Sequence, residues 1–287
     1  MVLKNLKNLI ILTKPRITLM SALMTLGGMF LSSRTLEYSN VLIITLASAL
    51  IVASANTLNM YLERNTDSFM ERTAKRPLPS KQMNPLVALY FGIFLGILSL
   101  FIFYSFINQL TTSIAFIALF LYVLVYTPLK YKSPTALFIG AIPGAMPPLM
   151  GWTAAENNLS EPGLALFLIL FIWQIPHFLA IALVRKQDYT NAGIKALPVV
   201  MEESKVRKHM VFYCLLLLPI SLLLVLPGVV GWIYATLAGI SGVIFSYEAV
   251  KGLSNETGVA QVRKIYFASL IYLPVLVGGI ILDMVIL

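Results

Sequence analysis

The stretch NTLNMYLERNTDSFMERTAKRPLPS, residues 56–80, lies where a long apolar segment ends, and it places Asn59, Glu63 and Asp67 four residues apart. On an α-helix a step of four residues advances about 400°, so these oxygen-bearing side chains drift by only roughly 40° per step and share one face. Ionisable groups at the edge of a hydrocarbon phase are costly and usually bind something charged. The stretch therefore predicts a helix end at a membrane surface, with a polar face that can hold a hard cation.

The composition places this stretch in a membrane protein. Of the 287 residues, 59% are hydrophobic and 11% are charged, and the mean hydropathy is +0.86. Windows of roughly 20 residues predict nine apolar spans: 15–33, 40–62, 85–106, 110–127, 134–154, 163–184, 209–226, 229–248 and 264–285. No soluble domain is left over, so we expect one all-α membrane domain over residues 1–287. The single cysteine, Cys214, excludes a disulfide framework and a thiolate metal site.

Lysine and arginine are distributed unevenly between the connections. Of the 21 basic residues, 20 lie in the N-terminal tail or after the second, fourth, sixth and eighth spans, and Arg34 alone lies on the other side. Because basic connections stay in the cytoplasm, we expect a cytoplasmic N-terminus and an external C-terminus. The net charge of +9 is then a topological signal, and nucleic acid is not an expected partner because no basic soluble domain exists. Without a transit peptide or a cleavage site, we expect a retained N-terminus in a prokaryotic plasma membrane.

The connection that follows Asp67 adds a pair of arginines. Arg72 and Arg76 are again four residues apart, and Pro77 and Pro79 would end any helix that carries them. Carboxylates followed by arginines suit a metal-bridged polyphosphate, because oxygen ligands hold Mg²⁺ while guanidinium groups neutralise phosphate oxygens. A solvated loop with incidental ion pairs and topology-setting arginines is the alternative.

A second polar stripe begins inside the sixth span, in FIWQIPHFLAIALVRKQDYTNAGIKALPVV, residues 171–200. Trp173 and Gln174 lie one turn before His177 on nearly the same side of a helix. Asp188 follows His177 by 11 residues, close to three turns, which is about 16 Å if the helix continues. The stripe predicts the wall of a pocket that leads to a cytoplasmic carboxylate. The alternative is a buried histidine that hydrogen-bonds a neighbouring helix.

A third cluster lies in YTPLKYKSPTALFIGAIPGAMPPLMGW, residues 126–152. Its glycines permit close helix approach, and its prolines bend the helix so that a cavity can open. Packing alone would explain these residues. Tyr126 and Lys130, at the cytoplasmic edge, are the members that we expect near phosphates.

These strings together carry a family resemblance. The motif N-x-x-x-E-R-x-x-D at 59–67, with ERTAKRPL, GAMPPLMGW, WQIPHF and DYTNAGIKALPVV after it, resembles the UbiA superfamily of intramembrane prenyltransferases. WQIPHF, followed by DYxxAG and LPVV, is similar to its haem-modifying branch. The resemblance implies nine transmembrane helices around a central cavity, with the two motif-bearing connections capping that cavity on the cytoplasmic side.

The implied reaction transfers the farnesyl group of farnesyl diphosphate to a vinyl group of haem B, with addition of water, and gives haem O and diphosphate. Departure of diphosphate leaves an allylic cation, so the protein must stabilise charge on the leaving group and exclude water until the cation is trapped. Mg²⁺ would be held by Asn59, Glu63, Asp67 and Asp188. The diphosphate would be neutralised by Arg72, Arg76, Lys130 and Arg185. Further substrate contacts would come from Tyr126, Trp173, Gln174, His177 and Lys186.

His177 is the candidate axial ligand of the haem iron, because imidazole is a common axial ligand and His209 lies at a basic cytoplasmic helix entry. Trp173 could stabilise the allylic cation through its aromatic face. One departure from the family pattern is Val184, which stands four residues before Asp188 where many members have a second aspartate. One Mg²⁺ would then do most of the work, or Arg185 and Lys186 would replace a second cation.

Two other functions remain open. A prenyltransferase of the same fold could use an aromatic acid or a quinone precursor as its acceptor. A transporter or a non-catalytic haem-handling assembly factor is also compatible with a polytopic chain, although the charged motifs gather at one mouth, whereas alternating access needs a site near the midplane. The expected partners are farnesyl diphosphate, haem B, the lipid bilayer, and a haem A synthase or a terminal-oxidase assembly.

Overall fold

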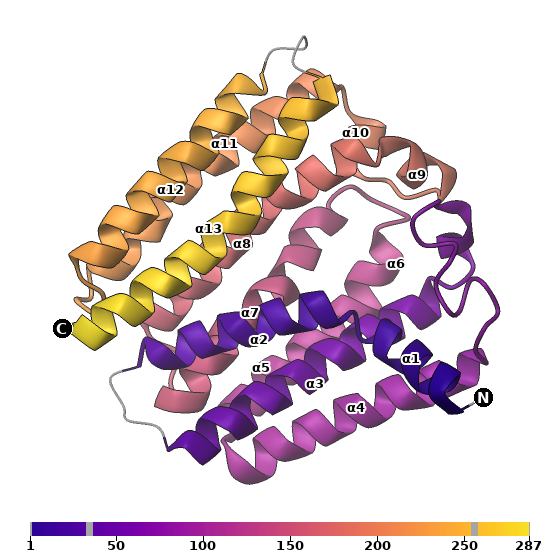
Figure 1. Ribbon diagram of the computed structural model, residues 1–287, viewed down its shortest axis with the longest axis horizontal. Helices are drawn as coiled ribbons and strands as arrows, with labels where there is room; N and C mark the ends of the chain where they lie inside the picture. The colour runs from indigo at the N-terminus through magenta and orange to yellow at the C-terminus, as the bar shows by residue number, and fades with distance from the viewer. Residues whose placement is uncertain (1, 33–36, 254–257, 287) are drawn as a thin grey trace.

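The computed structural model describes residues 2–32, 37–253 and 258–286, and this part of the chain contains helices and turns without a strand. Figure 1 shows the helices packed side by side in groups that cross one another at an angle. In chain order the elements are α1 (Val2–Leu12), α2 (Pro15–Phe30), α3 (Tyr38–Leu62), η1 (Thr66–Phe69), α4 (Pro85–Phe106), α5 (Gln109–Phe120), η2 (Leu121–Tyr126), α6 (Thr127–Leu129), α7 (Ala136–Glu156), α8 (Glu161–Val184), α9 (Lys186–Asn191), α10 (Leu197–Val200), α11 (Glu203–Leu222), η3 (Leu223–Val225), α12 (Trp232–Lys251) and α13 (Gly258–Ile286).

The chain is an integral membrane protein. Among the described residues, seven helical segments are long and apolar enough to cross a membrane, and an eighth is added if α1 and α2, bent by 48°, form one broken span. The remaining long helix, α7, has three interior prolines and is not among these segments. Nine crossings therefore stay a prediction. Arg34, on which the predicted orientation partly depends, lies outside the described residues.

Helix α1 is an addition that hydropathy did not predict. It packs through Leu12 in a small apolar cluster with Met60, Leu78 and Met83. The chain then turns at Lys14, which has a left-handed backbone (φ 48°), and Pro15 begins α2. Because proline is favoured in the first turn of a helix, the sequence stops one helix and starts the next within three residues. This bend brings Lys14 to the end of α3.

Helices α2 and α7 are in backbone contact. A Cβ atom on Gly28 would lie 2.0 Å from the carbonyl oxygen of Pro148, and one on Gly151 would lie 2.0 Å from the carbonyl oxygen of Thr25. Only glycine permits this separation. The small residues of GAMPPLMGW therefore do pack helices closely, as the sequence suggested, and they hold α7 at the centre of the bundle.

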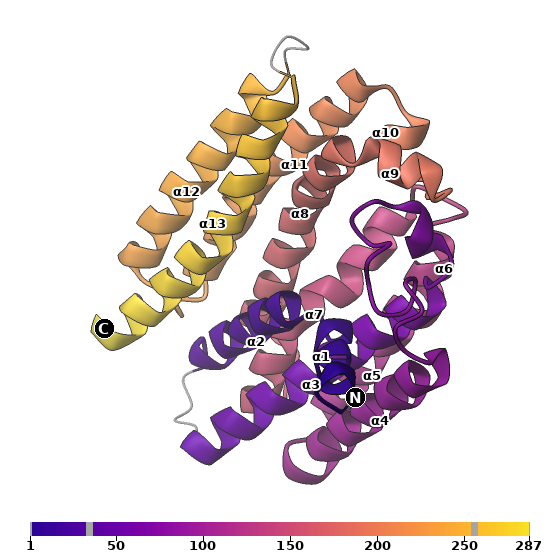
Figure 2. The ribbon, with the colours of Figure 1, turned by 45° about the vertical axis from the view of Figure 1, so that its right-hand side comes forward.

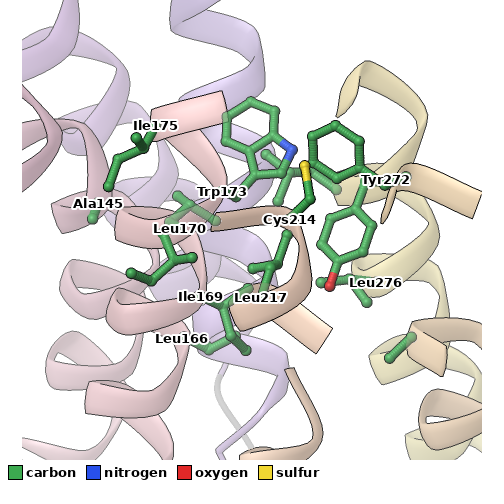
Figure 3. Packing of buried hydrophobic residues seen from close by; sticks show 14 of the residues in the cluster. Ala145, Leu166, Ile169, Leu170, Trp173, Ile175, Cys214, Leu217, Tyr272 and Leu276 are labelled. Carbon is green, nitrogen blue, oxygen red and sulfur yellow. The ribbon is translucent and has the colours of Figure 1, made fainter. Parts of the chain in front are cut away.

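The largest apolar core lies between α8, α11 and α13. Figure 3 shows Trp173 and Leu170 of α8 facing Cys214 and Leu217 of α11, with Tyr272 of α13 beside them. Cys214 is 1% exposed and free, which agrees with a small packing residue. This half of the bundle continues into α9 and α10, which lie beside the connection after α3 in both ribbon views (Figures 1 and 2).

Candidate functional site

Asn59, in the last turn of α3, is the centre of a buried polar cluster. Its amide nitrogen donates to Glu63 Oε1 at 2.6 Å and to Thr127 Oγ1 at 3.1 Å. Its amide oxygen accepts from Lys14 Nζ at 3.1 Å. The side-chain amide of Asn59 therefore contacts side chains from the end of α3, from α6 and from the α1–α2 bend, so this residue joins three segments at one end of the bundle.

The two carboxylates of the first motif are buried and paired with cations. Glu63 is 4% exposed and contacts Lys130 Nζ, while Asp67 is 1% exposed and accepts from Arg76 NH1 at 2.7 Å. Asp67 Oδ1 is the one buried side-chain polar atom without a hydrogen-bond partner in the described part of the chain. A buried carboxylate oxygen with no donor is poorly satisfied in the protein alone and is suited to accept a ligand or a cation.

The motif does not lie on one continuous helix, which corrects the expectation from spacing. Helix α3 ends at Leu62, and Asp67 belongs to the short 3-10 helix η1. Two i to i−4 backbone bonds persist, from Glu63 N to Asn59 O at 3.0 Å and from Asp67 N to Glu63 O at 2.8 Å. These bonds keep the three side chains near one another although the helix has ended.

The arginine pair is also not carried by a helix, since the structure has turns from Met70 to Ser80. Arg76 is directed at Asp67, as the ion pair shows, whereas Arg72 is exposed. Arg76 therefore belongs to the cluster, as predicted from the sequence. The two arginines do not share a helix face, although their four-residue spacing suggested it.

The second motif is interrupted in the same way. Helix α8 ends at Val184, Arg185 has a non-helical backbone (φ −110°, ψ 22°), and α9 begins at Lys186. A straight path of three turns from His177 to Asp188 is therefore wrong. Asp188 is 3.7 Å from the guanidinium of Arg185, at side-chain exposures of 16% and 43%, and Lys186 is exposed.

The two connections nevertheless meet. The amide of Lys195 donates to the carbonyl of Lys130 at 2.9 Å. Met70 of the first connection packs in an apolar cluster with Ala192 and Ile194 of the second, and Tyr189 lies against this cluster. The connections thus form one cap, as the family resemblance implied, over the end of the bundle where Asn59 lies.

Tyrosines line this cap. The hydroxyl groups of Tyr131 and Thr66 are hydrogen-bonded at 2.6 Å, and burial raises the pKa of the Tyr131 phenol above its ordinary value. Burial also raises the pKa of Tyr189, with Arg72 opposing and Glu63 adding to the shift. Both phenols therefore stay protonated donors at neutral pH. Tyr126 lies deeper, 5.3 Å from Tyr122 between ring centroids.

The donor set fits Mg²⁺ in chemistry. Carboxylate and amide oxygens are the ligands that this cation prefers, and Asp67 Oδ1 has no other partner. The described residues hold no group of three or more histidine, cysteine, aspartate or glutamate side chains that could hold a metal ion. A bound cation would therefore need the amide oxygen of Asn59, Asp188 from the other connection, or oxygens of the substrate.

His177 lies in a different environment, between α8 and α13. Its Nδ1 is 2.7 Å from Ser269 Oγ. Its ring is stacked between Trp173, 4.6 Å away at 20°, and Tyr266, 5.1 Å away at 28°. The hydrogen bond to a neighbouring helix is therefore present, as the alternative interpretation of this histidine required.

Gln174 does not share the direction of His177, which corrects the predicted stripe. Its amide nitrogen donates to the carbonyl of Ala141 at 3.2 Å, and a Cβ atom on Gly144 would lie 1.9 Å from its oxygen. Gln174 thus packs against α7, whereas His177 packs against α13. Residues three positions apart differ by about 60° around a helix, and here that angle is enough for Gln174 and His177 to face different helices.

Four members of the site were not predicted from the sequence: Lys14, Thr127, Tyr131 and Tyr189. Lys14 is 45 residues from Asn59 along the chain, and no spacing rule connects them. Tyr131 follows Lys130 directly and Thr127 precedes it by three residues. The polar residues that follow η2 were therefore the sequence feature that could have indicated both.

Comparison with known proteins gives a consistent result. The model of the UbiA prenyltransferase family matches residues 21–271. "Protoheme IX farnesyltransferase" of Myxococcus xanthus is 42% identical over 97% of this chain and 95% of its own length. The protein of that name from Aquifex aeolicus is 38% identical, over 97% and 96% respectively.

Solved structures agree on the fold. A structure described as a digeranylgeranylglyceryl phosphate synthase superimposes with a TM-score of 0.81 at 21% identity, covering 98% of this chain and 99% of that one. A UbiA homologue from Archaeoglobus fulgidus, solved with GPP and Mg²⁺, gives a TM-score of 0.69 at 14% identity, covering 96% and 99%. At these identities the likeness extends to the fold alone. Family model, relatives and fold together show that this chain belongs to the UbiA prenyltransferase family and is a membrane prenyltransferase.

Proposed function

We propose that this prenyltransferase transfers the farnesyl group of farnesyl diphosphate to a vinyl group of haem B. The C1–O bond of the donor breaks, and diphosphate leaves. The terminal vinyl carbon attacks the allylic cation and forms a C–C bond, and water adds to the other vinyl carbon and releases a proton. The products are haem O and diphosphate. The choice of donor and acceptor rests on relatives up to 42% identical that carry the farnesyltransferase name.

The observation that supports the donor half is the buried cluster of paired charges. Lys130 is held by Glu63, and Arg76 is held by Asp67 at 2.7 Å. Because these cations are already fixed in place, a diphosphate meets positive charge that needs no reorganisation when the C1–O bond breaks. Lys14, hydrogen-bonded to Asn59, adds a third basic side chain to the same end of the bundle.

The residues that would hold Mg²⁺ are Asn59, Glu63, Asp67 and Asp188. When bound, the cation would neutralise diphosphate oxygens and so lower the energy of the leaving group. Arg72, Arg185 and Lys186 lie on the exposed side of the cap. We infer that they attract the anionic donor, and that Arg185 and Lys186 replace a second cation, for which Val184 offers no carboxylate.

Tyr189 and Tyr131 complete the cap over the donor. With raised pKa values their phenols remain neutral donors, which can hydrogen-bond phosphate oxygens without adding negative charge. The cap also limits the access of water, which must reach the haem-derived cation only after the C–C bond forms. Tyr126, deeper in the bundle, would lie near the phosphates.

For the acceptor we propose the region of Trp173, Gln174 and His177. Flat aromatic side chains favour a porphyrin plane, and Trp173 can stabilise a passing cation through its face. The proposed orientation places the cap in the cytoplasm. The cap is formed by connections of the basic set, and 20 basic residues lie in the N-terminal tail and in the connections after the second, fourth, sixth and eighth predicted spans. A haem A synthase or an oxidase assembly would receive the product.

The acceptor can be tested directly. Purified protein in lipid nanodiscs receives farnesyl diphosphate and Mg²⁺ with equal amounts of haem B and 4-hydroxybenzoate, and both pools are analysed by mass spectrometry. We expect farnesylated haem and an unchanged phenol. A prenylated phenol with unmodified haem would establish the aromatic-acid alternative and contradict the proposal.

A non-catalytic haem carrier makes a different prediction. It would bind haem but release no diphosphate, and removal of Mg²⁺ with EDTA would change nothing. We expect diphosphate release to require haem, Mg²⁺ and Asp67, with haem binding retained when the metal is removed.

A further inference from the structure

Ser269 of α13 occupies an unusual position, because its hydroxyl contacts two partners that compete for one proton. Its Oγ is 2.5 Å from the backbone carbonyl oxygen of Tyr266 and 2.7 Å from Nδ1 of His177. The side chain is 0% exposed. A hydroxyl has a single hydrogen to donate, so only one of the two contacts can be a bond that Ser269 donates.

The backbone carbonyl of Tyr266 determines which of the two hydrogen bonds Ser269 donates. A carbonyl oxygen can only accept, and two oxygens at 2.5 Å are stable only with a proton between them. Ser269 therefore donates to Tyr266, and its oxygen must accept from His177. That requires the hydrogen of the neutral imidazole to be on Nδ1, with the lone pair on Nε2.

Nε2 is available for a ligand. In the described part of the chain Nε2 makes no hydrogen bond. Among the described residues, Asp67 Oδ1 is the one side-chain polar atom that is fully enclosed and has no partner. Nε2 also has no partner but is not fully enclosed, so it retains some accessible surface, although His177 as a whole is only 8% exposed. A partly accessible imidazole nitrogen with a free lone pair is a metal ligand or a base.

The surroundings fix the ring as well as its proton. Trp173 and Tyr266 stack on its two faces at interplanar angles of 20° and 28°. The indole nitrogen of Trp173 donates to the backbone carbonyl of Ser269 at 2.9 Å, and Figure 3 shows this indole among the buried residues between α8 and α13. The stacking limits rotation of the imidazole about its Cβ–Cγ bond, so the direction of Nε2 is set by Trp173 of α8 together with Tyr266 and Ser269 of α13.

We propose that Ser269 is a positioning residue, which holds His177 as the Nδ1–H tautomer so that Nε2 offers its lone pair to the iron of haem B. This rests on the proposed function for the identity of the ligand, whereas the tautomer follows from the hydrogen bonds. Ser269 itself would not touch the porphyrin. Loss of such a hydrogen bond to a ligating histidine typically weakens metal binding about 10- to 100-fold.

The tautomer can be measured without haem. The chain has two histidines, and the exposed His209 can be replaced in a His209→Gln variant. In ¹⁵N-histidine-labelled protein in nanodiscs, the remaining imidazole is expected to show a protonated Nδ1 and an unprotonated Nε2. In the same background, Ser269→Ala should shift the signal toward a protonated Nε2, and Ser269→Thr should restore the original pattern. A protonated Nε2 with Ser269 present overturns the proposal.

The ligand is tested by spectroscopy of bound haem B. We expect an iron–imidazole stretch in the resonance Raman spectrum of the ferrous complex, which His177→Ala abolishes. Ser269→Ala should lower haem affinity about tenfold and change this stretch, while Ser269→Thr restores both. The matched control is Ser99→Ala, which removes a 0% exposed hydroxyl on α4 and should leave both unchanged.

The outcomes separate this proposal from the proposed reaction. If His177→Ala leaves the haem spectrum unchanged while the protein still forms farnesylated haem, the positioning role is overturned and the reaction stands. If the tautomer and the iron–imidazole stretch respond to Ser269 as expected but no farnesylated haem forms, the role of Ser269 stands and the proposed reaction fails. A melting temperature near that of the unmodified protein confirms that each variant is folded.

Discussion

Replacing Asp67 by asparagine removes one negative charge from the centre of the polar cluster without changing its volume. Asp67 is 1% exposed, and its Oδ2 accepts from Arg76 at 2.7 Å. An asparagine oxygen can still accept from that guanidinium, so part of a charge-assisted hydrogen bond of about 1.5–3 kcal/mol is kept, with only the donor charged. The expected loss of stability is therefore about 1–2 kcal/mol, which leaves the protein folded.

The effect on turnover should be larger. The unpartnered Oδ1 of Asp67 is the oxygen that we expect to engage the metal–diphosphate. Loss of one fixed electrostatic group that acts on the leaving charge costs about 2.7–4 kcal/mol in the barrier, which lowers kcat about 10²- to 10³-fold. Asp67→Asn should also need more Mg²⁺ for half-maximal rate, since one anionic ligand is gone.

The assay is diphosphate release under saturating farnesyl diphosphate and haem B, titrated with Mg²⁺, alongside thermal unfolding in the same detergent. Asp283→Asn is the matched control, because Asp283 is also 1% exposed but accepts from backbone N–H groups at the start of α12. It should lower stability and leave kcat unchanged. Turnover of Asp67→Asn within about threefold of the unmodified protein, with the same Mg²⁺ requirement, would refute the assignment.

Three further substitutions test the fold and the site. Asp283→Ala should lower stability by about 3 kcal/mol, measured by thermal unfolding, because three backbone donors at the start of α12 lose their acceptor; an unchanged melting temperature would contradict this. Gly28→Ala should destabilise by about 1–3 kcal/mol because its Cβ would lie 2.0 Å from the Pro148 carbonyl oxygen, and stability equal to the unmodified protein would show that α2 and α7 are not in backbone contact. Lys14→Met should raise KM for farnesyl diphosphate about tenfold, or about 1.4 kcal/mol, and leave haem affinity unchanged, because Lys14 contacts Asn59 at the donor end; a KM that does not move would remove Lys14 from the site.

The membrane helices were largely predictable because burial in lipid is a property of composition. Long apolar segments gave positions close to those of α3, α4 and α8, and Pro85 marked the first turn of α4. The bend before α2 was not predictable from hydropathy. It depends on a left-handed residue at Lys14, whose stability comes from contacts made 45 residues away.

The site was predictable where contacts are local. Four-residue spacing correctly brought Asn59 and Glu63 together at 2.6 Å. The same rule failed for Asp67 as a member of one helix, since α3 ends at Leu62, and the two carboxylates pair with Lys130 and Arg76, which lie outside that helix. Spacing describes an isolated helix, and it carries no information on partners from elsewhere in the chain.

The acceptor is the part of the proposed function that rests most on similarity, and isotopic labelling of the product tests it most directly. The full-length protein is incubated with haem B, farnesyl diphosphate and Mg²⁺ in ¹⁸O-labelled water, and the haem fraction is analysed by mass spectrometry while diphosphate is quantified. We predict a haem that carries one farnesyl group and one ¹⁸O atom, with one diphosphate released per modified haem. Unmodified haem from folded protein that still releases diphosphate would contradict haem farnesylation.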